Sequence, residues 1–586
     1  MSTSTQPRRL VRRVLGAALA CTVLTGIATM SATPAQAVAT SPAEHYNPTR
    51  VPDRITLTPT ATPETSQYVS WRSSTAVTSP QVEVLVASSK TYRNDQMKFD
   101  AESTTIKTDL GYDAKFHKVT LAGLTGGTTY QYRVGDGTNW SEWQHFTTAK
   151  AGKKDFSFLY FGDVQNGIKS QSSRVIRNAL RDRPDADLMV QVGDIVNDAM
   201  SDEQWGEVYD ATGYAMGTKN FLMAPGNHEY EGDAISEQFQ AQFTYPDNGP
   251  KGSGADYDLL KGTVHYNDYQ GVRFISLNSN ASAAGPLAIQ TAWLKGVLEE
   301  NPNQWTVVYF HHPIFSLDEG RDNRTIRDAW LPLFEKHNVD LVLQGHDHAY
   351  GRGNHDDAEK DNPSTWNTEL SYDGPVYAVS VVGSKKYTAG PRLWNENDAH
   401  LRRMGGGLQL YQSVDVSEGK LRYESRTADG QYYDGFTILK NEHGKAVTDD
   451  KAPDVIDPDN PGPCLGCGTD PGTDPGTDPG AEDTIKYAPK KTLKSVDKSS
   501  ASLPAGVAFS AKRDHVFLGD QNGRKIFEID PVTDQVKNTM TLPRTSVIWA
   551  SMTRTTCCTW VSRTRTGSWS RPRQRPTVRS CVGRSR

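Results

Sequence analysis

Residues 156–163, FSFLYFGD, form an apolar run that stops abruptly at an aspartate, and the same pattern returns further along the chain. The other runs are ADLMVQVGD, which ends at Asp194; NFLMAPGNH, which ends at Asn227 and His228; WTVVYFHHP, with His311 and His312; and VDLVLQGHDH, with His346, Asp347 and His348. Hydrophobic runs of this length fit strands of a parallel sheet that is covered on both faces, and ligands gather at the carboxyl ends of such strands. We therefore predict one site at these strand ends.

The residues at the strand ends combine hard carboxylate and amide oxygens with imidazole nitrogens. This mixture suits Mn, Fe or Zn better than the all-oxygen cage that Ca or Mg prefers. His346 and His348 alternate along an extended segment, which places both side chains on the same side. The pattern favours a metal centre over a set of buried polar residues that only satisfy one another's hydrogen bonds.

The motifs GDVQ, GDIVND, GNHEY, HHP and GHDHAYGR, in this order, resemble the calcineurin-like metallophosphoesterase superfamily and are most similar to its bacterial, exported purple acid phosphatase-like branch. The resemblance covers roughly residues 48–440. It implies a four-layer α/β/β/α sandwich preceded by an all-β, fibronectin III-like domain. It also implies two divalent or trivalent metal ions as cofactors, either Fe, Mn or Zn.

By this resemblance, Asp194 bridges the two metals. The implied ligands of the first metal are Asp163 and His348, and those of the second are Asn227, His311 and His346. Two positions depart from the purple acid phosphatase pattern. Asn197 stands where the GDxxY motif carries the tyrosine that binds ferric iron, and Gln165 stands where GDxG has glycine. Gln165 and Asn197 are therefore both candidates for the vacant ligand position.

Several neighbouring residues are candidates for catalysis or for substrate binding. The resemblance places His228 toward the substrate, as a general acid or phosphate contact, with a structural role as the alternative. His312 is either a substrate contact or a packing residue. Arg321 and Arg324, in GRDNRT, are candidates for gripping phosphate, the alternative being solvated surface charges.

Three acidic or aromatic residues next to the motifs are expected to support the site without binding a metal. Glu229 and Tyr230 follow His228 and are expected to orient its loop. Asp347 lies between two predicted ligands and is expected to point away from them.

The resemblance implies an exported phosphatase in which a metal-bound hydroxide attacks a phosphate monoester. One alternative is a phosphodiesterase or nucleotide hydrolase on the same site. A second is a cell-surface binding protein whose β-modules contact cell wall or matrix and whose metal site is vestigial. The formal net charge of −5 gives no sign of nucleic-acid binding, so the expected partner is a small phosphoester.

The first 37 residues have the pattern of a signal peptide. Arginines at positions 8, 9, 12 and 13 precede an apolar stretch, and Ala35-Gln36-Ala37 offers a cleavage site. The apolar stretch is short for the ~20 residues of a spanning helix, and no later stretch is long enough. We expect secretion, by the Sec route rather than by twin-arginine export.

The remaining chain divides by composition. The predicted segments are an all-β domain at 48–149, a catalytic domain with its C-terminal strands at 153–440, a Pro/Gly/Asp-rich linker at 441–483, an incomplete β-propeller-like segment at 484–543 and a basic tail at 544–586. Aromatic residues of the first domain, among them Trp71, Tyr132 and Trp143, are expected to pack rather than to bind carbohydrate. The tail is rich in arginine but lacks lysine, aspartate and glutamate, so we interpret it as the product of a frameshift, with a genuine basic tail as the alternative.

Overall fold

The computed structural model describes residues 40–90, 94–355, 371–442 and 444–450, together with strands at 504–510, 515–520, 525–530, 535–541, 550–551 and 559–560. The predicted signal peptide and most of the predicted linker lie outside these residues. Contacts divide the chain into two compact units, Met1–Thr469 and Asp470–Arg586, which are described separately. Among the described helices, none is both long and apolar enough to span a membrane.

The N-terminal domain is all-β, as predicted. One layer contains β1 (Asp53–Thr58), β2 (Ser66–Ser74), β6 (Asp113–Ala122) and β5 (Glu102–Lys107), and the other contains β4 (Met97–Asp100), β3 (Gln81–Val86), β7 (Thr129–Gly135) and β8 (Gln144–Thr147). Trp71 from the first layer and Tyr132 from the second share one buried core. Trp143 packs on the Arg133 guanidinium, 4.7 Å from the ring centre. Trp71 and Tyr132 therefore pack in the core as predicted, whereas Trp143 is 41% exposed and its packing role stays a prediction.

The catalytic region contains two sheets. The first includes β9 (Phe156–Phe161), β10 (Leu188–Gln191) and β11 (Asn220–Met223), which pair in parallel. The second has the order β14 (His265–Tyr269), β15 (Val272–Ser276), β16 (Trp305–Tyr309), β17 (Leu341–Gln344), β20 (Val376–Val379), β18 (Ala349–His355) and β21 (Ala399–Gly406). The apolar runs that precede the five motifs are thus divided between two sheets, three in the first and two in the second.

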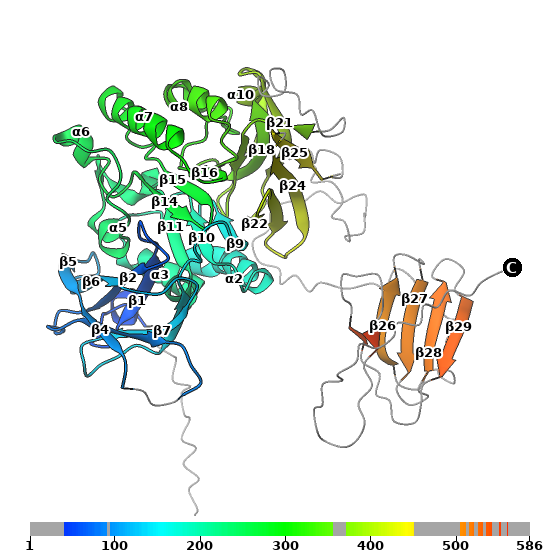
Figure 1. The fold of residues 1–586 in the computed structure, drawn as a ribbon, viewed down its shortest axis with the longest axis horizontal. Helices are drawn as coiled ribbons and strands as arrows, with labels where there is room; N and C mark the ends of the chain where they lie inside the picture. Colours follow the sequence, from blue (N-terminus) through cyan, green and yellow to red (C-terminus); the bar gives the residue numbers. More distant parts are fainter. Residues whose placement is uncertain are drawn as a thin grey trace, which may run out of the picture. The chain divides into compact units, whose positions relative to one another are not determined.

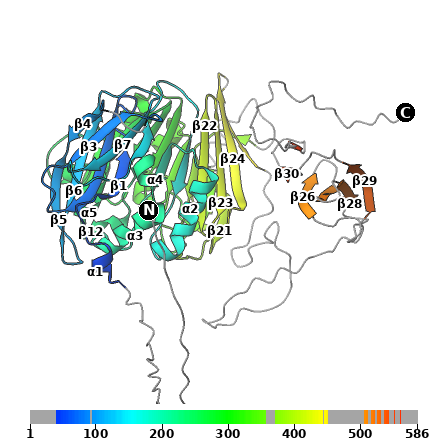
Figure 2. The same cartoon turned by 90° about the horizontal axis from the view of Figure 1, so that it is seen from below.

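Alternating side chains of the second sheet show how the layers pack. On β16, Val307 and Tyr309 lie in the core shared with the first sheet, whereas Val308 packs with helices α7 (Ala284–Glu299) and α8 (Arg324–Lys336). Helices α2 (Ser173–Asp182) and α3 (Asp202–Thr212) pack on the first sheet. The catalytic region is therefore a mixed α/β sandwich of four layers, with helices outside both sheets (Figures 1 and 2).

The N-terminal domain is joined to the catalytic region through a shared sheet, which the sequence did not predict. Leu57 of β1 pairs in parallel with Asn220 of β11. The first sheet consequently runs without interruption through twelve strands, from β19 (Ser371–Tyr372) to β5. In the order of this sheet, β1 lies between β11 and β2.

Antiparallel strands complete the other half of the first sheet. They are β22 (Leu410–Ser417), β23 (Lys420–Thr427), β24 (Tyr432–Asn441) and β25 (Gly444–Asp449), and β22 pairs with β9. The predicted start of the linker at residue 441 is wrong, because β25 pairs with β24 and extends the sheet to Asp449.

The remaining short elements connect these layers. They are α1 (Pro42–His45), η1 (Ile168–Ser172), α4 (Ala215–Thr218), η2 (Asn227–Glu229), β12 (Tyr230–Glu231), β13 (Ala234–Ile235), α5 (Glu237–Gln242), α6 (Ala255–Asp258) and α10 (Arg392–Asn395).

Among its described residues, the second unit contains a four-stranded antiparallel sheet in sequence order. Its strands are β26 (Pro504–Ser510), β27 (His515–Asp520), β28 (Lys525–Asp530) and β29 (Gln535–Thr541). A propeller blade has four such strands, but one sheet does not establish a propeller, so this interpretation stays a prediction. Apart from the short pair β30 (Ala550–Ser551) and β31 (Thr559–Trp560), the predicted frameshift tail lies outside the described residues.

Candidate metal centre

Glycines allow the strand ends to approach one another closely. Gly193 has a φ of +97°, and a Cβ there would overlap the backbone of Gly226 and lie 2.8 Å from His311 Nδ1. A Cβ on Gly345 would overlap Asp163 Oδ1. Glycine before Asp194 and before His346 therefore lets strand ends of two different sheets meet at one point.

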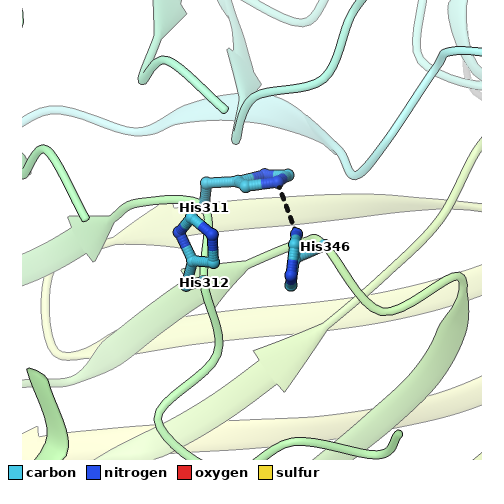
Figure 3. A group of neighbouring side chains, drawn as sticks. All are labelled: His311, His312 and His346. Carbon is cyan, nitrogen blue, oxygen red and sulfur yellow. Dashed lines mark hydrogen bonds between the residues drawn. The ribbon is translucent and has the colours of Figure 1, made fainter. Parts of the chain in front are cut away.

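The histidine of β16's end lies at the middle of the resulting cluster. His311 Nε2 is 3.2 Å from Asp194 Oδ2, 3.1 Å from Asn227 Oδ1 and 3.0 Å from His346 Nδ1. Figure 3 shows His311, His312 and His346 turned toward one another. The other two predicted ligands of the second metal and the predicted bridging residue thus all contact His311.

The predicted ligands of the first metal lie next to this group. His348 Nε2 is 3.4 Å from Asp163 Oδ2, and the ligand atoms of Asp163, Asp194 and His311 all lie within 4.8 Å of one another. The structure therefore brings together all six residues that the resemblance implies as metal ligands.

The charges of the cluster are buried. Burial is the main cause that raises the pKa of Asp163, to about 7, and the neighbouring Asp194 carboxylate acts in the same direction. Burial opposes protonation of His311, but the charges of Asp194, Asp163 and Glu229 prevail and raise its pKa to about 9. Buried carboxylates this close repel one another unless a cation lies between them.

Several buried atoms of the cluster lack a partner, which tests whether metals fit. Among the described residues, Asp163 Oδ2, Gln165 Oε1 and His348 Nδ1 make no hydrogen bond. Buried polar atoms are normally satisfied, so unpaired carboxylate and amide oxygens beside imidazoles are the environment that a cation would complete. The residues fit a pair of Mn, Fe or Zn ions.

Of the two candidates for the vacant ligand position, only Gln165 joins the cluster. Its side chain is buried, and Nε2 donates to Asp194 Oδ2 at 2.7 Å. Asn197 is exposed, and its Oδ1 accepts from Asn166 Nδ2. This placement argues against the prediction that Asn197 binds a metal, because its amide oxygen is bonded at the surface.

The motif loops are held in strained conformations by buried carboxylates. Asp194 and His346 have φ values of +52° and +70°, a left-handed conformation that only surrounding contacts can maintain. The Glu229 carboxylate accepts from the N–H groups of Asp194, Ile195 and Gly226 at 2.7–2.9 Å. The prediction that Glu229 orients the loop is confirmed.

Asp347 supports a second loop and points away from the ligands, as predicted. Its Oδ2 accepts from Ser316 Oγ and from the N–H of Leu317, and its Oδ1 accepts from Arg321 Nη1. Tyr230 also has a structural contact, because its hydroxyl accepts from Asn278 Nδ2.

His228 is placed to act beside the cluster. Its backbone N–H donates to Asp194 Oδ1 at 2.9 Å, and its Nδ1 lies 2.6 Å from the Asn197 carbonyl oxygen. A carbonyl can only accept, so Nδ1 carries the proton and Nε2, 4.0 Å from Asp194 Oδ2, faces the site. Its side chain is 28% exposed, which leaves Nε2 accessible to a substrate.

His312 borders a cleft on the other side of the cluster. Its Nδ1 bonds to Ser279 Oγ at 2.9 Å, and its ring centre is 4.2 Å from that of His346. The cleft has a volume of about 330 Å³ and is lined by Ser279, His312 and Thr325, among others. His312 therefore lies between the cluster and a cleft, and its role as a substrate contact stays a prediction.

The two predicted phosphate-binding arginines differ in position. The nitrogens of Arg321 donate to the His346 carbonyl, Asp347 and the Tyr387 hydroxyl, so this guanidinium braces the motif. Arg324 is 76% exposed and pairs with Asp328 one turn along α8. The prediction for Arg324 is not supported, because its side chain is a solvated surface charge.

Two residues of the segment SKKY (384–387) also lie at the cluster, although no sequence pattern identified them. The Tyr387 N–H donates to the His348 carbonyl at 3.2 Å, and its ring centre is 4.7 Å from that of His348. Lys385 Nζ lies 5.2 Å from the Tyr387 ring centre. The segment follows β20 and has no motif of its own.

Comparison with known proteins agrees with this geometry. Residues 52–148 match the model of the purple acid phosphatase N-terminal domain, and residues 156–350 match that of the calcineurin-like phosphoesterases. An uncharacterized protein of Mycobacterium tuberculosis is 27% identical over 335 residues, which are 49% of this chain and 59% of that protein. The chain therefore spans less than two thirds of the length of this relative.

Two further similar proteins are acid phosphatases by name. Acid phosphatase type 7 of Danio rerio is 24% identical over 365 residues, covering 56% of this chain and 78% of that protein. The solved structure of a purple acid phosphatase from yellow lupin has a TM-score of 0.52 at 18% identity, covering 67% of this chain and 75% of that one.

The fold and the strand-end cluster define a metallophosphoesterase with a dinuclear metal centre. The chain belongs to the calcineurin-like metallophosphoesterases, in their purple acid phosphatase-like branch.

Proposed function

We propose that this chain is an exported, metal-dependent phosphatase that hydrolyses phosphate monoesters. The observation that carries the proposal is the cluster of seven potential ligands, the six implied by the resemblance and Gln165, in which Asp163, Gln165 and His348 each keep a buried polar atom without a hydrogen bond. Asp163, His348 and Gln165 would hold one metal and Asn227, His311 and His346 the other, with Asp194 shared. Two ions there would activate water and neutralise phosphate charge.

His228 is the proposed general acid. Its bond to the Asn197 carbonyl fixes the proton on Nδ1 and turns Nε2 toward the site. In the imidazolium form, Nε2 would donate a proton to the leaving oxygen, as a general acid. His312 would contact the alcohol portion of the substrate from the cleft beside Ser279.

Hydrolysis of model esters tests the proposal. The purified, metal-loaded protein is expected to cleave p-nitrophenyl phosphate faster than bis-p-nitrophenyl phosphate, and a chelator is expected to abolish both activities. A preference for the diester would favour a phosphodiesterase or nucleotide hydrolase. Failure to cleave either ester with two metals bound would support a binding protein with a vestigial site.

The metal-loaded enzyme is also expected to lack a strong purple colour. That colour arises in purple acid phosphatases from a tyrosinate bound to ferric iron, and Asn197 cannot supply this donor. Visible absorption spectra recorded against iron content check the expectation. An intense band that rises with iron content would contradict it, and Tyr387→Phe would then show whether Tyr387, beside His348, is the donor.

A further inference from the structure

Two cationic side chains, Arg321 and Lys385, lie next to the cluster, and they differ in the number of protein groups that they contact. Arg321 donates to three protein acceptors, the His346 carbonyl, Asp347 and the Tyr387 hydroxyl, and its Nε lies 3.4 Å from Asp318. Because the Arg321 guanidinium already contacts these four protein groups, it holds the motif in place rather than binding a ligand. Within the described residues, the ammonium of Lys385 makes no hydrogen bond and no ion pair. It lies over the Tyr387 ring, 5.2 Å from the ring centre.

The segment that carries Lys385 is anchored to the site at both ends. At its start, the N–H groups of Val382 and Gly383 donate to the Asp163 carbonyl at 2.9 and 2.7 Å. At its end, the Tyr387 N–H donates to the His348 carbonyl. Ser384, immediately before Lys385, donates its hydroxyl to the Asn166 carbonyl at 2.8 Å. Lys385 is therefore held beside the two predicted ligands of the first metal, and its position does not depend on its own side chain.

The Tyr387 ring connects Lys385 to the cluster. Lys385 Nζ is 5.2 Å from the centre of this ring, and the ring centre is 4.7 Å from that of His348. The ammonium is thus close enough to act on this part of the cluster. It is also only partly buried, so a ligand can reach it from solvent.

We propose, on the basis of the function above, that Lys385 recognises the second negative charge of a phosphate monoester and so selects monoesters over diesters. A monoester carries close to two charges above its second pKa of about 6, whereas a diester carries one. An ammonium is a point charge that binds phosphate without the fixed geometry of a guanidinium. It therefore stabilises the dianion most, and the diester gains little from it.

The test compares two neighbouring lysines in the metal-loaded, full-length protein. Lys385→Met is expected to lower kcat/KM for p-nitrophenyl phosphate about tenfold and to leave that for bis-p-nitrophenyl phosphate unchanged. Lys386→Met removes the same charge from the next, exposed residue and is expected to change neither. The deficit of Lys385→Met should shrink as pH falls below about 6, because the monoester then carries a single charge.

The outcomes separate this inference from the proposed function. Equal losses on both esters, or an equal loss in Lys386→Met, would overturn the role of Lys385. If the wild-type protein cleaved neither ester, the proposed function would fail. Calorimetric binding of inorganic phosphate to the metal-loaded protein would still decide the inference: tenfold weaker binding in Lys385→Met supports it, and unchanged binding refutes it.

Discussion

Asp194→Asn is expected to lower turnover by two to three orders of magnitude, on the scale of losing a key charge-stabilising group, and to lower the metal content as well. The carboxylate contacts three elements of the cluster: His311 Nε2, the His228 N–H and Gln165 Nε2. Asparagine keeps the shape but removes the charge. It also turns an amide N–H₂ toward groups that already donate, so it cannot satisfy them all. Metal analysis and p-nitrophenyl phosphate kinetics on the same preparation measure both effects.

His228→Ala is the matched control for this substitution. It removes a side chain that faces the site but leaves the backbone N–H that bonds to Asp194. We expect full metal content and a loss of turnover of about 10²- to 10⁴-fold, which is the usual contribution of a general acid. Full activity of Asp194→Asn with two metals bound would show that the cluster is not the active site.

The cluster could be predicted from the sequence because each of its residues ends a local pattern. A buried apolar run predicts a strand, and an abrupt residue of metal-ligand type marks its end, so Asp163, Asp194 and His311 were identified from a few neighbouring residues each. The alternation of His346 and His348 is also local. Such local patterns can be recognised in the sequence without knowing how the strands are paired.

The contacts that escaped prediction join segments far apart in sequence. Arg54 bonds to Asp202, 148 residues away, and Arg321 bonds to Tyr387, 66 residues away. Neither pair has a spacing that periodicity or turn chemistry would reveal. The pairing of β1 with β11 is of the same kind, because β1 has the composition of any sandwich strand. The alternatives left open for Asn197 and Arg324 could not be decided from the sequence for a related reason: the sequence gives their distance from a motif but not the direction of their side chains.

The interface between the N-terminal domain and the catalytic region contains one buried carboxylate at the centre of a hydrogen-bond network. Asp202, the first residue of α3, is fully buried and accepts hydrogen bonds from Arg54, Arg72 and Tyr112 at 2.8–2.9 Å. Burial alone would raise its pKa, but Arg54 and Arg72 outweigh it, so the pKa of Asp202 is lowered. The two arginines come from β1 and β2, so this network fixes the β-domain to the helix that follows the GDIVND motif.

Asp202→Ala is expected to destabilise the protein by about 3–5 kcal/mol, because it leaves two buried guanidinium groups without this partner. Denaturant unfolding at neutral pH, followed by circular dichroism, measures the loss. Asp328→Ala is the control: it removes an exposed helical carboxylate from its pair with Arg324 and should cost at most about 1 kcal/mol.

The pH dependence of that difference distinguishes a charge effect from simple loss of packing. A carboxylate whose pKa is lowered on folding stabilises the protein above its unfolded pKa, and this contribution disappears as pH falls through the lowered folded value. The gap between wild type and Asp202→Ala should therefore narrow in acid below about pH 4, the ordinary aspartate range. A gap of the same size at pH 3 and pH 7 would mean that Asp202 acts through its volume, and that the paired charges do not hold the two domains together.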